Sequence, residues 1–391
     1  MIRGITLRGA IALNVITMIG IGPLITIPLV LQKLHGPLAL AGWIAGALVA
    51  LCDGLVWAEL GSQYPGAGGT YAYLRDVFGA QRWGRLLAFV YNWQYVLSVS
   101  LVVASGYIGF AQYAAYLYPP IAANPNLLHL TAVSIGLISI AFVYRRITAV
   151  ANLGGVLAIL AVGTLAIVGI AGFWHASSGP GFGYSISNNA TFGWAFAVGL
   201  GQALYITLYD YGGYAQVATV GEEVIEPRRT LPRSIVVSVA IVFAFYLFLQ
   251  IGVLTGIDWQ TLFDAHGDPT PASQFVGSTV VQHAWGYAAA VVVTLLVLLT
   301  AFASLYGNLV GAARVPFAAA RDNAFLPAFA RLHPRGQFPH ISLLGIGAIS
   351  IAACFFTLDQ VIAALIAASI VGGSIAQIAA LFVLRARRER A

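Results

Sequence analysis

Apolar residues along this chain of 391 residues form long runs separated by short polar segments. A helix needs about 20 largely apolar residues to cross a membrane, because it rises about 1.5 Å per residue through a core about 30 Å thick. The runs of that length predict ten membrane-spanning helices. They cover residues 10–31, 38–61, 84–117, 128–144, 148–174, 192–221, 232–256, 283–312, 340–357 and 360–384.

The composition supports this prediction and excludes a water-soluble protein of two or three domains. Hydrophobic residues make up 60% of the chain and charged residues only 8%, and the mean hydropathy is +0.86. Soluble domains average about 45–50% apolar and about 25% charged residues. The two cysteines, Cys52 and Cys354, lie in apolar runs, so a secreted scaffold held by disulfides is also excluded. We therefore expect an all-α integral membrane protein.

Basic residues are distributed unequally between the two predicted sides of the membrane. Lys and Arg in short loops resist translocation, so their positions set the orientation of the chain. Only Lys33 falls on the outer side, which predicts that both termini are cytoplasmic. The arginines on the other side are Arg3, Arg8, Arg75, Arg82, Arg85, Arg145, Arg146, Arg228, Arg229, Arg233, Arg314, Arg321, Arg331, Arg335, Arg385, Arg387, Arg388 and Arg390. The net charge of +6 therefore points to anionic membrane lipids as partners and not to nucleic acid.

Two of the predicted spans contain helix-breaking residues near the middle. The first has Gly20, Gly22 and Pro23, and the sixth has the segment Tyr209-Asp210-Tyr211-Gly212-Gly213-Tyr214. Broken helices at corresponding positions of two halves mark the binding site in many secondary transporters. Positions one and six correspond if spans 1–5 and 6–10 are two inverted repeats. The alternative for each break alone is a glycine-rich packing face with a proline kink.

Unwound backbone at membrane depth offers both kinds of polar group to a ligand. Free N–H groups at the start of a half-helix suit an anion, and free carbonyl groups at the end of another suit a cation or an ammonium group. A zwitterionic amino acid has both charges, so we expect residues 19–23 to bind its carboxylate and residues 209–213 its ammonium. The predicted substrate-binding residues are Thr17, Ile19, Gly20, Ile21, Gly22, Tyr209, Asp210, Gly212, Gly213 and Tyr214.

Three carboxylates lie in or near the predicted spans, where ionisable groups are costly and are functional candidates by default. Asp210 could contact the substrate ammonium, bind a cation or carry a proton; alternatively it could cap N–H groups of the second half of its own span. Asp53 could be a proton relay or a neutral structural side chain bonded to a neighbour. Glu59 lies closer to the membrane surface, and we expect it to pair with a cytoplasmic arginine.

The eighth span carries hydroxyl groups that could form a sodium site with carbonyls of the first span. Such hydroxyls often bond the carbonyl of the preceding turn instead. The coupling and gating candidates are Asp53, Asp210, Thr300, Ser304 and Asn308. The seven histidines have no metal-ligand spacing, and no nucleophile, base and acid lie at a common depth. The sequence therefore predicts no metal, no other cofactor and no enzymatic activity.

Four motifs, in order along the chain, resemble the amino acid/polyamine/organocation superfamily, and specifically its amino acid permeases. The first is similar to the glycine motif of helix 1, and the others resemble the loops after helices 2, 6 and 8. They are Gly20-Ile21-Gly22; Trp57-Ala58-Glu59-Leu60-Gly61 with Tyr64-Pro65-Gly66-Ala67-Gly68-Gly69-Thr70-Tyr71; Glu222-Glu223 with Glu226-Pro227-Arg228-Arg229 and Leu231-Pro232-Arg233; and Ala320-Arg321-Asp322-Asn323 with Leu326-Pro327.

The resemblance implies a five-plus-five inverted-repeat transporter fold with discontinuous helices 1 and 6. The first repeat would cover residues 1–174, an extracellular linker 175–191, the second repeat 192–384, and a basic cytoplasmic tail 385–391. Three departures stand out. Members of the family usually have twelve spans, Ala215 occupies the place of a glutamate in the helix 6 break, and residues 149–172 lack the lysine that some members carry in helix 5.

The predicted function is a secondary active transporter that moves amino acids across the plasma (inner) membrane by alternating access. The alternatives are a transporter of polyamines or other organic cations and an amino acid sensor that does not transport. The preferred amino acid, the coupling ion (H⁺ or Na⁺) and the oligomeric state stay open at this point.

Overall fold

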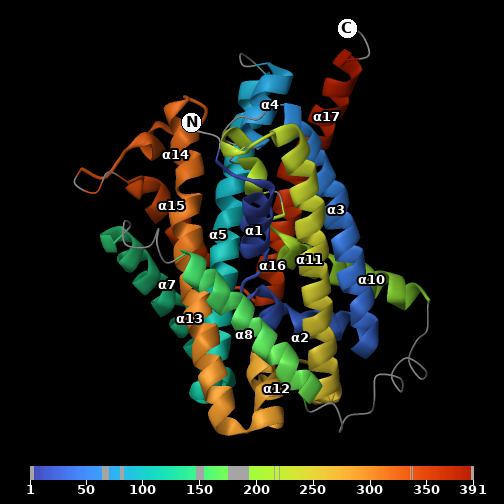
Figure 1. The fold of residues 1–391 in the computed structure, drawn as a ribbon. Coiled ribbons are helices and arrows are strands. Elements are labelled where there is room, and N and C mark those ends of the chain that lie inside the picture. The colour runs from blue at the N-terminus through green and yellow to red at the C-terminus, as the bar shows by residue number, and fades with distance from the viewer. Residues whose placement is uncertain are drawn as a thin grey trace.

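A computed structural model describes residues 4–63, 70–79, 83–146, 154–174, 193–214, 216–219, 221–334, 336 and 338–388. These residues form a bundle of helices that is long in one direction (Figure 1). The α-helices are α1 (Leu7–Met18), α2 (Gly22–Leu34), α3 (Ala39–Gln63), α4 (Thr70–Phe78), α5 (Trp83–Leu117), α6 (Pro120–Ala123), α7 (Pro125–Arg146), α8 (Gly154–Trp174), α10 (Trp194–Tyr211), α11 (Pro227–Gly256), α12 (Val276–Trp285), α13 (Tyr287–Ala312), α14 (Arg314–Arg321), α15 (His340–Ala353), α16 (Leu358–Ser369) and α17 (Ile375–Arg388). Short 3-10 helices cover Gly36–Leu38, Gln216–Thr219, Gly221–Glu223, Trp259–Leu262, Pro271–Phe275 and Pro327–Ala330, and a π-helix covers Ile370–Ser374.

The chain is a multi-pass membrane protein. Among the described residues, 6 helices are long and apolar enough to cross a membrane, and the pair α1 and α2, bent by 58°, makes a further candidate. Two shorter apolar helices, Ile159–Trp174 and His340–Ala353, accompany them. The presence of several apolar spans is confirmed, whereas the total of ten and the inverted repeat stay predictions.

Most predicted spans coincide with helices, and two differ in an informative way. The predicted span 283–312 is wrong at its start, because α12 ends at Trp285 and α13 begins only at Tyr287. Gly286 between them has a φ of +86°, a conformation that only glycine adopts readily. Similarly, the apolar run 192–221 is not one helix, because α10 ends at Tyr211. Apolar residues continue through both turns, so hydropathy alone does not reveal them.

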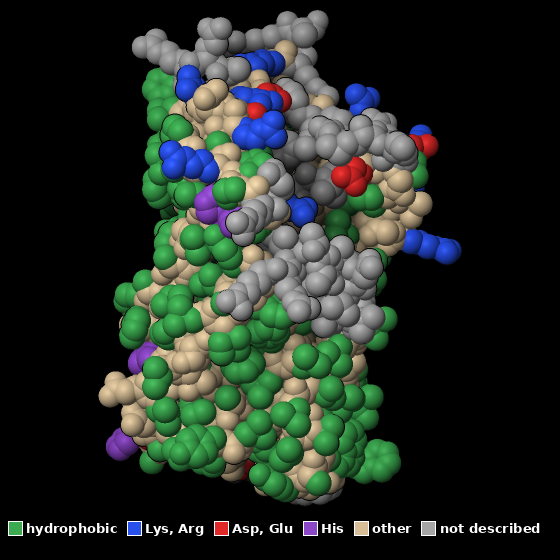
Figure 2. All heavy atoms as spheres, turned by 90° about the vertical axis from the view of Figure 1, so that its left-hand side faces the viewer, with side chains coloured by type: hydrophobic (Ala, Val, Ile, Leu, Met, Phe, Trp, Pro, Cys, Tyr) green, Lys and Arg blue, Asp and Glu red, His purple; other side chains and the backbone are tan. Residues whose placement is uncertain are grey.

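Both ends of the described chain lie at the same end of the bundle (Figure 1). The backbone N–H groups of Gly4 and Ile5 both donate to the carbonyl of Glu223 at 2.9 Å, and Arg385 near the other terminus forms an ion pair with Glu59. Figure 2 shows Lys and Arg side chains gathered toward this end, above a surface of mostly hydrophobic side chains. This agrees with the charge asymmetry in the sequence, and the assignment of this end to the cytoplasm stays a prediction.

Helices α8 and α11 approach each other through small residues. A Cβ atom added to Gly172 would lie 1.9 Å from the carbonyl oxygen of Gly252, and one added to Gly252 would lie 2.7 Å from that of Gly169. Real Cβ atoms do not come so close, so each of these positions requires glycine. Close backbone contact of this kind supplies packing energy where lipid removes the hydrophobic driving force between helices.

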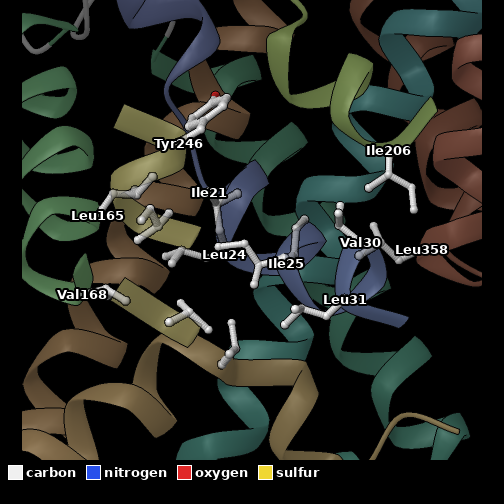
Figure 3. Close-up of a cluster of buried hydrophobic side chains, with 14 of the residues drawn as sticks. Ile21, Leu24, Ile25, Val30, Leu31, Leu165, Val168, Ile206, Tyr246 and Leu358 are labelled. Carbon is white, nitrogen blue, oxygen red and sulfur yellow. The ribbon is translucent and has the colours of Figure 1, made fainter. Parts of the chain in front are cut away.

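Helix α2 lies at the centre of the bundle. Nine of its 13 residues are buried, as expected of a helix that is hydrophobic on most sides. Figure 3 shows Leu24 and Ile25 of α2 among side chains of other helices, including Leu165 of α8 and Tyr246 of α11. The helix that begins at the first predicted break is therefore held on all sides by tertiary contacts.

Candidate functional site

The first predicted break is present. Helix α1 ends at Met18 and α2 begins at Gly22, at an angle of 58°. Among the described residues, no backbone hydrogen bond uses the N–H groups of Gly20, Ile21 or Gly22. Three successive free amides at the start of a helix form a site that favours an anion, because the partial positive charge of the helix dipole adds to their donors.

The second predicted break is present as well. Helix α10 ends at Tyr211, and Gly213 follows with a φ of +115°. The next N–H groups bond elsewhere: Gly212 donates to the carbonyl of Tyr209 at 3.1 Å, and Gln216 donates to that of Gly213 at 3.0 Å. Within the described chain, the carbonyls of Tyr211 and Gly212 receive no backbone donor. Free carbonyls at a helix C-terminus carry partial negative charge and suit an ammonium group or a cation.

The two breaks are in direct contact. A Cβ atom on Gly22 would lie 2.4 Å from Asp210 Oδ1 and 3.4 Å from the Tyr209 ring, and one on Gly213 would lie 2.9 Å from Thr17 Cγ2. The glycines therefore act sterically, since any side chain would force the two breaks apart. The tertiary structure thus brings the predicted binding segments 17–22 and 209–214 together.

Tyr246 of α11 joins the two breaks. Its hydroxyl group lies 2.7 Å from the carbonyl oxygen of Met18 and 3.0 Å from that of Asp210. These carbonyls belong to the last turns of α1 and α10, where no further helical N–H group can reach them. The ring is 1% exposed and packs at 5.2 Å from Trp43 and 5.4 Å from Tyr211. One side chain therefore satisfies the C-terminal ends of both half-helices.

The position of Asp210 differs from the predicted one. It lies in the last turn of α10 and not in the break itself, and its side chain is turned toward α2, where Thr26 Oγ1 lies 2.6 Å from Asp210 Oδ2. The residue is 3% exposed, and Oδ1 has no hydrogen-bond partner in the part of the chain that the structure describes. The predicted alternative of a cap on N–H groups of the same span is wrong, because the carboxyl contacts a hydroxyl of another helix.

Neighbouring polar residues hold the same segments in place. Tyr209 and Ser105 of α5 share a hydrogen bond of 2.8 Å between their hydroxyl groups. Asn14 of α1 is buried, accepts from the N–H of Val217 at 2.9 Å, and donates to Ser238 of α11 at 3.4 Å. Ser105, Asn14 and Tyr246 are functional candidates that the sequence did not indicate, whereas Tyr209 was predicted. The signal that could have found them is a polar or tyrosine side chain at mid-span, away from the interfacial belt where tyrosine is common.

The three candidates of the eighth predicted span lie on α13. A Cβ atom on Gly20 would lie 3.8 Å from Ser304 Oγ, so Ser304 faces the first break, and the Asn308 amide donates to the Ser304 carbonyl at 2.9 Å. Thr300 Oγ1 is buried without a partner, so it does not bond the preceding turn. Among the described residues, no group of three His, Cys, Asp or Glu side chains could hold a metal ion. The sodium site stays a prediction.

The two other carboxylates have specific partners. Tyr214 donates to Asp53 Oδ2 at 2.7 Å, so Asp53 is tied to the end of the second break. Glu59 pairs with Arg385 through two hydrogen bonds, which confirms the expected pairing with an arginine. Ala215, the expected linker 175–191 and residues 64–69 of the second motif lie outside the described residues.

A polar cluster joins three helices at the end of the bundle opposite the chain termini. Asp359 of α16 lies 3.8 Å from the Lys33 ammonium of α2 and accepts from the Tyr205 hydroxyl of α10 at 2.5 Å. A cavity of about 350 Å³ lies beside it, lined in part by Lys33, His35, Phe196 and Trp259. The cluster links α2, α10 and α16.

Comparison with known proteins gives a consistent result. The model of a family described as amino acid permease matches residues 5–391. An uncharacterized transporter of Mycobacterium bovis is 28% identical over 82% of this chain and 66% of its own length. A vacuolar cationic amino acid transporter of Arabidopsis thaliana is 26% identical over 88% of this chain and 57% of its own. A serine/threonine exchanger of Bacillus subtilis is 25% identical over 78% of this chain and 66% of its own. The chain thus spans less than two thirds of the length of each relative.

Proposed function

The chain belongs to the amino acid permease family, and from this premise we propose that it is a secondary active transporter that moves amino acids across the plasma membrane by alternating access. Its relatives are transporters, and the names of two of them mention amino acids. The observation that carries the proposal is the contact between two helix breaks that offer opposite polar groups. Among the described residues, one break has amides without a backbone partner at Gly20, Ile21 and Gly22, and the other has carbonyls without a backbone donor at Tyr211 and Gly212.

In this proposal the substrate lies between the two breaks. Its carboxylate accepts hydrogen bonds from the amides at the start of α2, where the helix dipole adds to the attraction. Its ammonium donates to the carbonyls at the end of α10. The charged groups of the substrate and the unpaired backbone groups of the two breaks then bind each other, so that neither is exposed to lipid. The α-carboxylate and α-ammonium are common to all amino acids, so these contacts select the class and leave the choice among amino acids to the side-chain pocket.

The predicted substrate-binding residues differ in their exposure to solvent, and this difference supports a site that is closed on one side. Thr17 and Gly212 are exposed, whereas Ile19, Ile21 and Asp210 are buried. The partly exposed cluster of Asp359, Lys33 and Tyr205 joins α2, α10 and α16. If the termini are cytoplasmic, this arrangement corresponds to a transporter that is closed to the outside, and breaking that cluster would begin the movement to the outward-facing state.

Counterflow into liposomes tests the proposal. Purified protein is reconstituted in liposomes loaded with a mixture of the twenty unlabelled L-amino acids, and radiolabelled amino acids and polyamines are supplied outside one at a time. We expect accumulation of at least one amino acid and of no polyamine. Accumulation of a polyamine alone would favour the organic-cation alternative. Binding of amino acids in a thermal-shift assay without any counterflow would favour the sensor, and either result would overturn the proposal.

A further inference from the structure

We propose that Asp210 binds the proton that couples this transporter to the proton gradient, so that one proton moves in the same direction as each amino acid. The inference rests on the proposed function and adds the coupling ion and its binding residue. It starts from the buried carboxyl, of which one oxygen has no hydrogen-bond partner among the described residues.

The hydrogen bonds around Asp210 fit a protonated carboxyl. Thr26 Oγ1 lies 2.6 Å from Asp210 Oδ2 and 3.1 Å from the carbonyl oxygen of Gly22. A threonine hydroxyl has a single hydrogen, so it cannot serve both acceptors fully. If the carboxyl carries a proton, Asp210 donates to Thr26 and Thr26 donates to Gly22, so both contacts become normal hydrogen bonds. An ionised carboxylate would instead leave a buried charge with no cation and with one bare oxygen, which is costly.

No described residue compensates a charge at this position. Asp210 takes part in no ion pair within 4.0 Å among the described residues. Helices α2, α3, α11 and α16 surround α10 here. Helix α5 also reaches α10 here, through the Ser105 hydroxyl. The titratable groups around the two breaks, as distinct from those farther along the same helices, have partners of their own or are phenols. These groups are Lys33 with Asp359 and Tyr205, Asp53 with Tyr214, and the tyrosines 209, 211 and 246. Residues 149–172, which include most of α8, also contain no Lys or Arg.

The position of Asp210 explains how proton and substrate can be coupled. Asp210 Oδ1 lies against Gly22, one of the three residues whose amides bind the substrate carboxylate in the proposed function. Two negative charges in a water-poor site repel each other strongly. Binding of a proton to Asp210 therefore makes carboxylate binding more favourable, and by linkage the bound amino acid makes proton binding more favourable to the same extent.

The proton step is simple. On the side where the site is open, a proton from water forms an O–H bond with the Asp210 carboxylate and the amino acid binds. After the change of conformation the amino acid leaves, the O–H bond breaks and the proton passes to water on the other side. No bond of the substrate changes.

The test records proton movement and substrate exchange in the same liposomes. A pH-sensitive dye, pyranine, is trapped inside, and an equimolar mixture of the twenty L-amino acids is added outside at equal pH. We expect the mixture to acidify the lumen of liposomes with wild-type protein. Asp210→Asn, which imitates the protonated carboxyl in shape and charge, should lose this acidification, and the rate at which it exchanges labelled amino acids should no longer depend on pH. Exchange without acidification in the wild type, or acidification that persists in Asp210→Asn, would overturn the inference.

Two further variants keep the test decisive if Asp210→Asn does not fold. Thr26→Ala removes the hydroxyl that contacts the carboxyl, and we expect it to shift the pH at which exchange is half-maximal. Thr164→Ala is the matched control, since Thr164 is also buried and also bonds the carbonyl four residues before it, at 2.8 Å. Equal pH profiles for the two variants, or loss of acidification in Asp53→Asn with normal exchange, would assign the proton elsewhere. Absence of any exchange in the wild type would instead count against the proposed function itself.

Discussion

Replacing Tyr246 with phenylalanine removes one hydroxyl group and keeps the ring that packs against Trp43 and Tyr211. The hydroxyl is within hydrogen-bonding distance of the last-turn carbonyls of both α1 and α10. Phenylalanine leaves both carbonyls buried without this donor. The two half-helices then lose the shared contact that sets the distance between the amides of one break and the carbonyls of the other.

The size of the effect follows from the number of groups involved. A buried polar group that loses its partner costs about 1–3 kcal/mol. Because a single hydroxyl hydrogen is shared between the two carbonyls, we take about 2 kcal/mol for the pair. A loss of about 2 kcal/mol from the binding-competent conformation corresponds to a roughly 30-fold weaker apparent affinity. We therefore expect Tyr246→Phe to raise the KM of counterflow by up to roughly 30-fold.

A matched control separates positioning of the site from general stability. Tyr113 is also fully buried; its hydroxyl donates to the carbonyl of Leu24 at 3.2 Å and accepts from the N–H of Gly277 at 3.1 Å. Tyr113→Phe should lower the midpoint of thermal unfolding in detergent about as much as Tyr246→Phe does, but it should leave the KM unchanged. If both variants had the same KM, Tyr246 would be a structural residue only and the reasoning would be refuted.

Three further outcomes are expected. Gly22→Ala should abolish counterflow, because its methyl carbon would lie 2.4 Å from a carboxyl oxygen, whereas Gly163→Ala, with open space around it, should exchange normally; equal rates would contradict the close contact. Asp359→Asn weakens a partly exposed cluster, so it should slow exchange and change the free energy of unfolding by less than about 1 kcal/mol; a large loss of stability with normal exchange would speak against a closing role. Burial, and then a hydrogen bond to a neighbouring carboxylate, raise the pKa of Tyr71, so its neutral form stabilises the fold below about pH 10 and this contribution is lost at higher pH. As the pH rises above about 10, the thermal midpoint of Tyr71→Phe should therefore fall less than that of the wild type. Equal falls in the two proteins would exclude the effect.

The two helix breaks could be located from the sequence because their causes are local. Proline lacks an N–H donor and glycine weakens a helix wherever it stands, so Gly20, Gly22 and Pro23 predict a break without knowledge of any neighbour. The pairing of Glu59 with an arginine was also within reach, because a carboxylate near the membrane surface has cytoplasmic arginines close by. The identity of that arginine, Arg385, was not, since 326 residues separate the two.

The direction of the Asp210 side chain is a different case. The sequence predicted a position inside the break, with either a functional role or a cap within its own span. The structure places the residue in the last helical turn, facing Thr26, which lies 184 positions earlier in the chain. A one-residue shift of the helix end turns a side chain by about 100°, since a helical turn holds 3.6 residues. The packing of α10 against α2 and α3 orients that turn, which the local sequence does not determine.

The amino-acid sequence by itself determined that this is a helical membrane protein, where two of its helices break, and which end of the bundle carries the positive charge. These properties depend on the transfer of each segment into lipid and on local backbone preferences. Only the tertiary structure decided that the two breaks touch, that Tyr246 holds both, and that Lys33, Tyr205 and Asp359 meet on the far side. Such contacts join residues distant in the chain, and they depend on how whole helices pack, which no local pattern records.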